Sequence, residues 1–130
     1  LVADFTAREN VELILRAGGR SGADAAALAA AALDRVGLEG LHARFPRELS
    51  GGQAQRVGIA RAVAGDRPLI LADEPTGSID QRTSLGIFEL LRSLADEGRS
   101  IVLSSHDPRA GEFAHRALHL ADGVLEPAAA

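Results

Sequence analysis

Residues 69–75 read Leu-Ile-Leu-Ala-Asp-Glu-Pro, a short apolar run that ends in two adjacent carboxylates. A continuous apolar run of this length is typical of a strand that is buried on both faces of a parallel sheet. In open α/β sheets, ligands bind at the carboxyl ends of the strands. The run therefore predicts that Asp73 and Glu74 lie at a ligand-binding edge. A strand that ends in two solvated acids before a turn is the alternative that this run leaves open.

The two carboxylates can have separate roles, because adjacent side chains point in opposite senses if the strand continues through them. One can hold Mg²⁺, usually through water, since this ion retains much of its hydration shell. The other can orient or deprotonate an attacking water. Proline restricts the residue before it, so Pro75 predicts an extended backbone at Glu74 that fixes the aim of its side chain.

Outward from this strand, helical patterns alternate with short apolar runs. A strongly periodic helix is expected from Gln81 to Asp96, and a second buried strand from Ser100 to Ser104. Strands that alternate with helices indicate an α/β fold with a parallel sheet. Further helices are expected at 7–16, 24–36, 50–64 and 109–115, a third strand at 116–120, and a turn at Asp122-Gly123 with room for a short strand after it.

The composition excludes several classes of site. The net charge of −4 argues against a nucleic-acid-binding surface, which needs a basic face, so no nucleic-acid partner is expected. The absence of cysteine excludes disulfides and cysteine-based metal sites, and the four histidines lack the spacing of metal ligands. No apolar run approaches the roughly 20 residues that span a bilayer, so any membrane role is expected to come through a partner.

The chain contains no lysine and no methionine. A phosphate-binding P-loop, GxxxxGK followed by serine or threonine, needs a lysine that reaches the β- and γ-phosphates. These residues therefore cannot form such a loop. Leu1 is too large to be the residue usually exposed when an initiator methionine is removed, so we expect that it is not a natural N-terminus.

The segment Ser50-Gly51-Gly52-Gln53 opens an expected helix. A helix N-terminus presents free N–H groups and a partial positive charge, and glycines let an anion approach that backbone closely. Ser50 is a good N-cap and can also donate a hydrogen bond to a phosphate. The segment therefore predicts an anion-binding site, with simple helix capping as the open alternative.

His106 follows the second expected strand, within Ser104-Ser105-His106-Asp107. Because the carboxyl ends of parallel strands meet at one edge of a sheet, His106 is expected near Glu74. A histidine there can contact a terminal phosphate and report its presence. An exposed loop histidine without such a role is the alternative.

Together, these segments resemble the ATP-binding cassette family of transporter ATPases. Residues 49–53 are LSGGQ, the signature motif of that family. Residues 69–75 resemble its Walker B strand with the catalytic glutamate. Gly77-Ser78-Ile79-Asp80 is similar to its D-loop, and residues 104–107 are similar to the segment of its switch histidine.

Two further segments are similar to one branch of this family, the lipoprotein-releasing and macrolide-export branch. They are EPTG at 74–77 and the segment 5–11. Ala3 departs from the proline often found in that branch, and Ile79 departs from the usual leucine.

The resemblance implies the C-terminal portion of a P-loop NTPase-type parallel sheet, with an α-helical signature subdomain. Residues 1–64 would form the helical subdomain that ends in the signature helix, residues 65–126 the C-terminal part of the ATPase core, and residues 127–130 a fraying tail. The family's P-loop, adenine-stacking residue and Q-loop glutamine would precede Leu1. The sheet is therefore expected to expose an edge and part of its core.

The resemblance also implies a role for each matched residue. Asp73 would serve Mg²⁺, Glu74 would be the general base for water, and His106 would hold the γ-phosphate of ATP. Asp80 would lie in the contact between two ATPase domains. The γ-phosphate bound to the other domain of a head-to-tail dimer would be capped by Ser50, Gly51, Gly52 and Gln53.

The implied function is that of an ATP-hydrolysing subunit that drives a transmembrane permease, as a peripheral protein at the cytoplasmic face of the inner membrane. Without a P-loop, the chain alone is expected to be inactive. A non-catalytic docking module is the alternative, which the intact residues Asp73, Glu74 and His106 disfavour. An ATPase of DNA repair or chromosome structure is disfavoured by the acidic charge and by the short stretch before Leu49.

Overall fold

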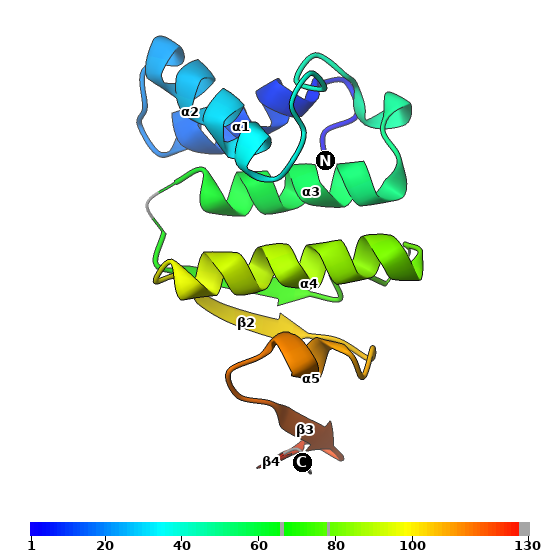
Figure 1. The fold of residues 1–130 in the computed structure, drawn as a ribbon. Coiled ribbons are helices and arrows are strands. Elements are labelled where there is room, and N and C mark those ends of the chain that lie inside the picture. The colour runs from blue at the N-terminus through cyan, green and yellow to red at the C-terminus, as the bar shows by residue number, and fades with distance from the viewer. Residues whose placement is uncertain (66, 78, 128–130) are drawn as a thin grey trace.

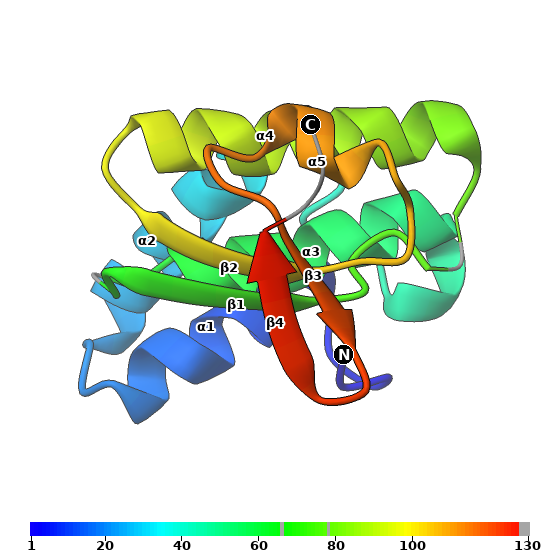
Figure 2. The same cartoon turned by 90° about the horizontal axis from the view of Figure 1, so that it is seen from below.

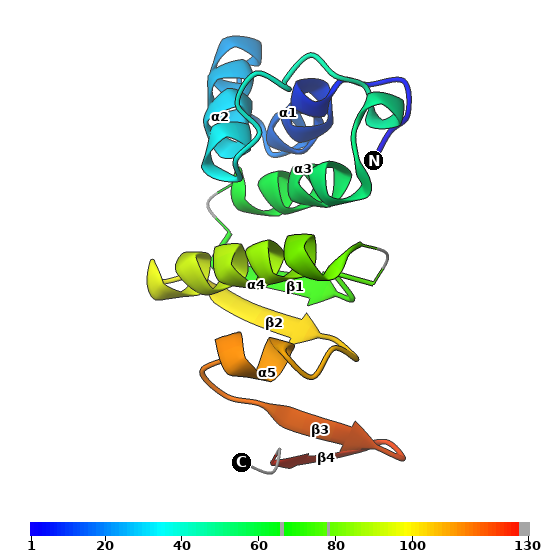
Figure 3. The same cartoon turned by 45° about the vertical axis from the view of Figure 1, so that its right-hand side comes forward.

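The computed structural model describes residues 1–65, 67–77 and 79–127. Its helices are α1 (Ala7–Ala17), α2 (Gly22–Arg35), the short 3₁₀ helix η1 (Pro46–Glu48), α3 (Gly51–Val63), α4 (Gln81–Asp96) and α5 (Ala110–Phe113). Its strands are β1 (Leu69–Asp73), β2 (Ser100–Ser104), β3 (Leu118–Ala121) and β4 (Val124–Pro127). The elements form a stack, with α1, α2 and α3 at one end, then α4, the strands β1 and β2, α5, and the β3–β4 hairpin (Figures 1 and 3).

Each of the four long helices begins at a side-chain cap. Thr6 caps α1, with Glu9 completing a capping box, and Ser21 caps α2. Ser50 and Asp80 cap α3 and α4. These caps satisfy N–H groups that have no partner within the helix, so the starts of the helices are fixed by local sequence.

A single cluster of buried apolar side chains joins the helices to the sheet. Val11 of α1, Leu33 of α2 and Val57 of α3 belong to it, and all three are 0% exposed. Ile87 of α4 and Ile70 of β1 extend the same cluster. Burying one such side chain contributes about 1.5–3 kcal/mol, so the cluster holds α3 against α4.

The strands β1 and β2 form a parallel pair, with Leu69 opposite Ser100 and Asp73 opposite Ser104. Parallel strands need a crossover connection, and α4 provides it. Figure 2 shows the two strands side by side, and Figures 1 and 3 show their arrowheads pointing the same way. The expected parallel α/β arrangement is confirmed, and the two strand ends deliver Asp73 and Ser104 to one place.

The expectation that both strands are buried on both faces is wrong. Ile70 is 4% exposed, whereas Leu71 is 73% exposed and Val102 is 60% exposed. Side chains alternate between the two faces of a strand, and in the described part of the chain only the face of Ile70 is covered. A continuous apolar run indicates that both faces of the strand favour burial, but it does not show that the chain has a segment to pack on each face. The expected exposure of part of the apolar sheet surface is confirmed.

The last two strands form a hairpin of their own. β3 pairs with β4 in an antiparallel ladder and is not part of the β1–β2 sheet. Asp122 and Gly123 have φ values of +48° and +79°, the left-handed geometry of a tight hairpin turn, so the turn expected there is confirmed. The third expected strand begins later than predicted, at Leu118. Most of the predicted fraying tail, Ala128–Ala130, lies outside the described residues.

Arg99 ties the end of α3 to the start of the sheet. Its guanidinium donates to the carbonyls of Val63 (3.3 Å), Gly65 (3.0 Å) and Arg67 (2.7 Å). We predict that Arg99→Ala lowers the free energy of unfolding by about 1–3 kcal/mol, because these carbonyls lose charge-assisted hydrogen bonds. Urea unfolding measures the loss, with Arg82→Ala on the exposed side of α4 as the control. Equal losses in the two variants would contradict the prediction.

Candidate catalytic edge and signature segment

Glu74 leaves β1 in an unexpected backbone conformation. Its φ is +44°, so the extended geometry expected from Pro75 is wrong. The Glu74 amide donates to the Ser104 carbonyl (3.1 Å), and the Glu74 carbonyl accepts from the Gly77 amide (3.1 Å). The chain thus turns at Glu74 while it is still bound to β2, and these contacts outweigh the preference of a residue before proline. The strand ends at Asp73, so alternation does not set the directions of the two carboxylates.

Glu74 and His106 meet at the end of the sheet. His106 Nδ1 lies 2.9 Å from Glu74 Oε2, and the two side chains are 78% and 41% exposed. The predicted proximity of these residues is confirmed. Because both remain open to solvent, a water molecule and a phosphate can reach them. The pair therefore has the geometry in which a carboxylate base and a histidine act on the same bound group.

Asp73 is held by the neighbouring strand. The Ser104 hydroxyl donates to Asp73 Oδ1 at 2.5 Å. No group of three or more histidine or acidic residues in the described part of the chain could hold a metal ion by itself. Mg²⁺ normally takes one or two carboxylates together with phosphate oxygens and water, so a single carboxylate at this edge fits that ion.

Ser104 is a site residue that the sequence prediction missed as a partner of Asp73. The signal that could have found it is its register. Two parallel strands of equal length place Asp73 opposite Ser104, and the hydroxyl then faces the carboxylate.

Ser50 and Gln53 form a reciprocal capping box at the start of α3. Ser50 Oγ accepts from the Gln53 amide (3.2 Å), and Gln53 Oε1 accepts from the Ser50 amide (2.9 Å). Helix capping, the alternative stated for this segment, is therefore present. The two glycines differ: Gly51 is exposed, whereas Gly52 is buried. A Cβ on Gly52 would overlap Thr83 Cγ2 of α4, so only glycine lets α3 and α4 approach this closely.

Asp80 caps α4 and is exposed. Its carboxylate accepts from the Thr83 amide (3.0 Å) and from the Thr83 hydroxyl (2.6 Å). These two hydrogen bonds, the hydroxyl first, hold the pKa of Asp80 below its ordinary value of 3.8. The carboxylate therefore stays charged at the start of α4. Ser78 of the predicted D-loop lies outside the described residues.

One hollow brings several predicted site residues together. Gly51, Glu74 and His106 line a cavity of about 420 Å³, to which Gln55, Pro75, Gly77 and Ile79 also contribute. The N-terminal turn of α3 thus opens onto the candidate catalytic edge of the same chain, the edge that carries Glu74 and His106. Asp73, Ser50, Gly52, Gln53 and Asp80 are not among the lining residues.

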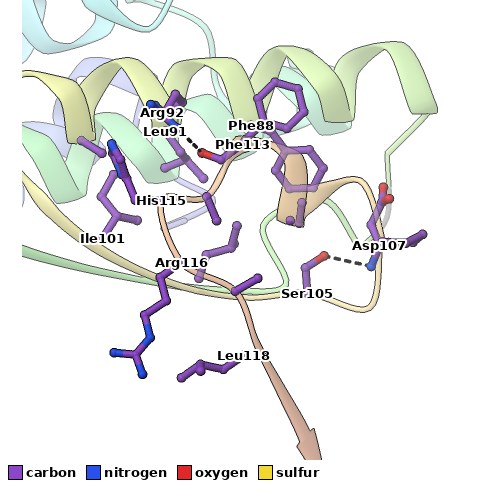
Figure 4. Close-up of a pocket in the computed structure, with 17 residues that line it drawn as sticks. Phe88, Leu91, Arg92, Ile101, Ser105, Asp107, Phe113, His115, Arg116 and Leu118 are labelled. Carbon is purple, nitrogen blue, oxygen red and sulfur yellow. Dashed lines mark hydrogen bonds between the residues drawn. The ribbon is translucent and has the colours of Figure 1, made fainter. Parts of the chain in front are cut away.

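A second hollow, of about 440 Å³, lies between α4, β2 and α5 (Figure 4). Phe88 and Phe113 lie against each other in it, with ring centroids 5.7 Å apart, and Arg92 donates to the Phe113 carbonyl. None of the predicted site residues lines this cavity. Ser105 and Asp107, the neighbours of His106 in the predicted switch-histidine segment, do line it, so this cavity adjoins the edge that carries Glu74 and His106.

Comparison with known proteins decides the family. The sequence profile described as "ABC transporter" matches residues 1–77. The chain belongs to the ABC transporter family. It is 42% identical over 125 residues to the macrolide export ATP-binding/permease protein MacB of Agrobacterium fabrum, a match that covers 96% of this chain and 19% of MacB. It is 41% identical over 128 residues to the ABC transporter ATP-binding protein YknY of Bacillus subtilis, covering 98% of this chain and 56% of YknY.

Solved structures agree with this assignment. A dimeric ATP-binding cassette, MJ0796 bound to ADP and Pi, superposes with a TM-score of 0.82 at 40% identity, covering 97% of this chain and 56% of that cassette. The predicted α/β fold of a P-loop NTPase and the macrolide-export branch are confirmed. This chain of the ABC transporter family spans about half of YknY and a fifth of MacB. No described helix has the length and apolar character that a membrane crossing requires.

The close approach at Gly52 gives a stability prediction. We expect Gly52→Ala to destabilise this ABC transporter family chain by about 1–3 kcal/mol, because the added methyl overlaps Thr83 Cγ2. Combining it with Thr83→Ser removes that methyl and keeps the hydroxyl for Asp80, so most of the loss should be recovered. Urea unfolding of the two single variants and the double variant measures the recovery. Additive losses would contradict the predicted overlap.

The lowered pKa of Asp80 gives a pH prediction. A carboxyl whose pKa is depressed in the folded state contributes stability that is present above its ordinary pKa and is lost as pH falls through the lowered value. We predict that the stability advantage of wild type over Asp80→Asn is constant between about pH 7 and 5 and shrinks below about pH 4. Urea unfolding across this pH range measures the advantage. An advantage that does not change down to about pH 3 would exclude this role of Asp80.

Proposed function

We propose that this chain carries the hydrolytic edge and the signature face of an ATPase that powers an ABC transporter. The observation that carries the proposal is the Glu74–His106 pair, which lies at the carboxyl edge of a parallel sheet. This edge is where α/β folds bind their ligands. The transported substrate is not recognised by this edge and would be selected by a partner.

Each residue at the edge has a distinct role in the proposal. Glu74 accepts a proton from the attacking water, and His106 holds the terminal phosphate while keeping Glu74 in place through its Nδ1 contact. Asp73, fixed by the Ser104 hydroxyl, serves Mg²⁺ together with water and phosphate oxygens. When bound there, Mg²⁺ would help to neutralise the charge that develops on the phosphate oxygens.

The signature segment acts on a nucleotide held by a second ATPase domain. Ser50, Gly51, Gly52 and Gln53 cap its γ-phosphate, and Asp80 lies in the contact between the two domains. Support comes from the exposed N-terminus of α3, which attracts anions. The similar MJ0796 cassette is described as a dimer bound to ADP and Pi, the products of hydrolysis.

The same proposal assigns the remaining parts of the assembly. A transmembrane permease is the partner that couples the ATP-driven association of the two ATPase domains to transport. The name of the similar MacB includes a permease. The ATPase would work at the cytoplasmic face of the membrane. Residues 1–64 would be the helical subdomain that meets the permease, and residues 65–126 the part of the ATPase core with the hydrolytic edge.

A docking module without catalysis is the second candidate function. The 130 residues themselves contain no lysine that could hold phosphates in a P-loop. In this case the chain would present its signature face to a partner's nucleotide and hydrolyse nothing. We therefore propose that the 130 residues alone do not hold ATP or hydrolyse it.

Replacement of the proposed base tests the catalytic role. In the protein as its gene encodes it, Glu74→Gln should slow ATP hydrolysis by about 100-fold or more while ATP still drives association of the ATPase domains. Glu89→Gln, an exposed change on α4, is the matched control and should leave both properties unchanged. Hydrolysis assays and light scattering measure the two. A normal rate of hydrolysis in Glu74→Gln would exclude Glu74 as the base.

A further inference from the structure

Thr83 stands between two segments that are far apart in the sequence. Its methyl group packs on Gly52, the second residue of the signature motif's glycine pair, where a Cβ would overlap Cγ2. Gly52 is buried at this contact, and Thr83 is half-buried. The first turn of α3 therefore rests directly on the first turn of α4 through this pair.

The other side of Thr83 holds Asp80. The Thr83 hydroxyl donates to Asp80 Oδ2 (2.6 Å), and the Thr83 amide donates to Asp80 Oδ1 (3.0 Å). The Ser84 hydroxyl adds a bond to the Asp80 carbonyl (3.0 Å). Both carboxylate oxygens and the backbone of Asp80 are thus fixed by the start of α4.

We propose that Thr83 is a positioning residue that locks Ser50–Gln53 and Asp80 into one rigid face. This inference rests on the proposed function, in which both groups meet a second ATPase domain. The two groups of one side chain divide the task, because the methyl sets the position of α3 and the hydroxyl sets that of Asp80. A face of fixed shape reaches its partner without first ordering two independent segments, which lowers the cost of association.

Ordinary helix capping is the competing explanation of the Thr83–Asp80 bonds, and it makes a different prediction. Capping acts only within α4, so a change at Thr83 would leave the start of α3 undisturbed. A positioning role requires that a substitution at the start of either helix, α3 or α4, changes the local stability of the start of the other. The coupling is reciprocal by thermodynamic necessity.

Hydrogen exchange on the 130-residue chain tests this coupling. Thr83→Ser removes only the methyl, Thr83→Val removes only the hydroxyl, and Thr83→Ala removes both. We expect Thr83→Ser and Thr83→Ala to speed exchange of the Gln53 amide by about tenfold, and Gly52→Ala to speed exchange of the Ser84 amide similarly. Thr83→Val keeps the Gln53 amide protected.

Ser21→Ala is the matched control, because it removes a cap of the same kind from α2. Ser21 Oγ accepts from the Asp24 amide (3.2 Å), away from the site. This variant should lower stability while leaving exchange at Gln53 and Ser84 unchanged. Unchanged Gln53 exchange in both Thr83→Ser and Thr83→Ala would overturn the proposal.

A second measurement uses the protein as its gene encodes it. Thr83→Ala should raise the ATP concentration for half-maximal self-association by about tenfold, and Ser21→Ala should not. Faster exchange combined with wild-type association would also overturn the positioning role. Wild-type protein that neither associates with ATP nor hydrolyses it would refute the proposed function instead, and the exchange data would still decide the coupling through Thr83.

Discussion

The hydrogen bond from the Glu74 amide to the Ser104 carbonyl, one step beyond the last paired residues of β1 and β2, is the constraint on which this arrangement depends. It keeps the two strand ends together after the ladder is complete. Ser104 also donates to Asp73, so one residue of β2 positions both carboxylates. Two residues later, His106 reaches Glu74. The chemistry of the edge thus follows from the register of a single parallel strand pair.

Packing extends this constraint to the signature segment. The cluster that contains Val57 and Ile87 holds α3 against α4, and Gly52 allows their first turns to touch. Since α4 also packs against β2, α3 is placed relative to the sheet edge that carries Glu74 and His106. Gly51 then opens onto the hollow of Glu74 and His106. Ser50 and Gln53 cap α3, and the same two side chains are proposed to contact the phosphate.

The sequence predicted well whatever depends on short-range pattern. The bounds of α4 and β2, the turn at Gly123 and the proximity of Glu74 to His106 follow from periodicity, glycine chemistry and the rule that parallel strands end at one edge. Features decided by tertiary contacts other than this one were missed. The apolar run indicates that Leu71 favours burial, but it does not show whether another segment covers that face of the sheet. None of the described segments does, and Leu71 is therefore exposed.

Two details of the site show the same limit. The left-handed Glu74 arises from bonds to Ser104 and Gly77 that no local rule contains. The contact of Gly52 with Thr83 joins residues in different helices. From the sequence alone, a glycine at the start of a helix is explained equally well as a position where an anion can approach the backbone. The roles of the individual site residues therefore rest on the family and on chemistry, and experiments on the protein must decide them.

The central claim is that these residues act on a nucleotide whose phosphates are held outside the 130-residue chain. Calorimetric titration of Mg²⁺-ATP into this chain tests it most directly. We expect no saturable heat at micromolar ATP, since a lysine-bearing P-loop is absent from the sequence. Tight, Mg²⁺-dependent binding to the chain alone would contradict it, because the edge and the signature segment would then suffice to hold the nucleotide.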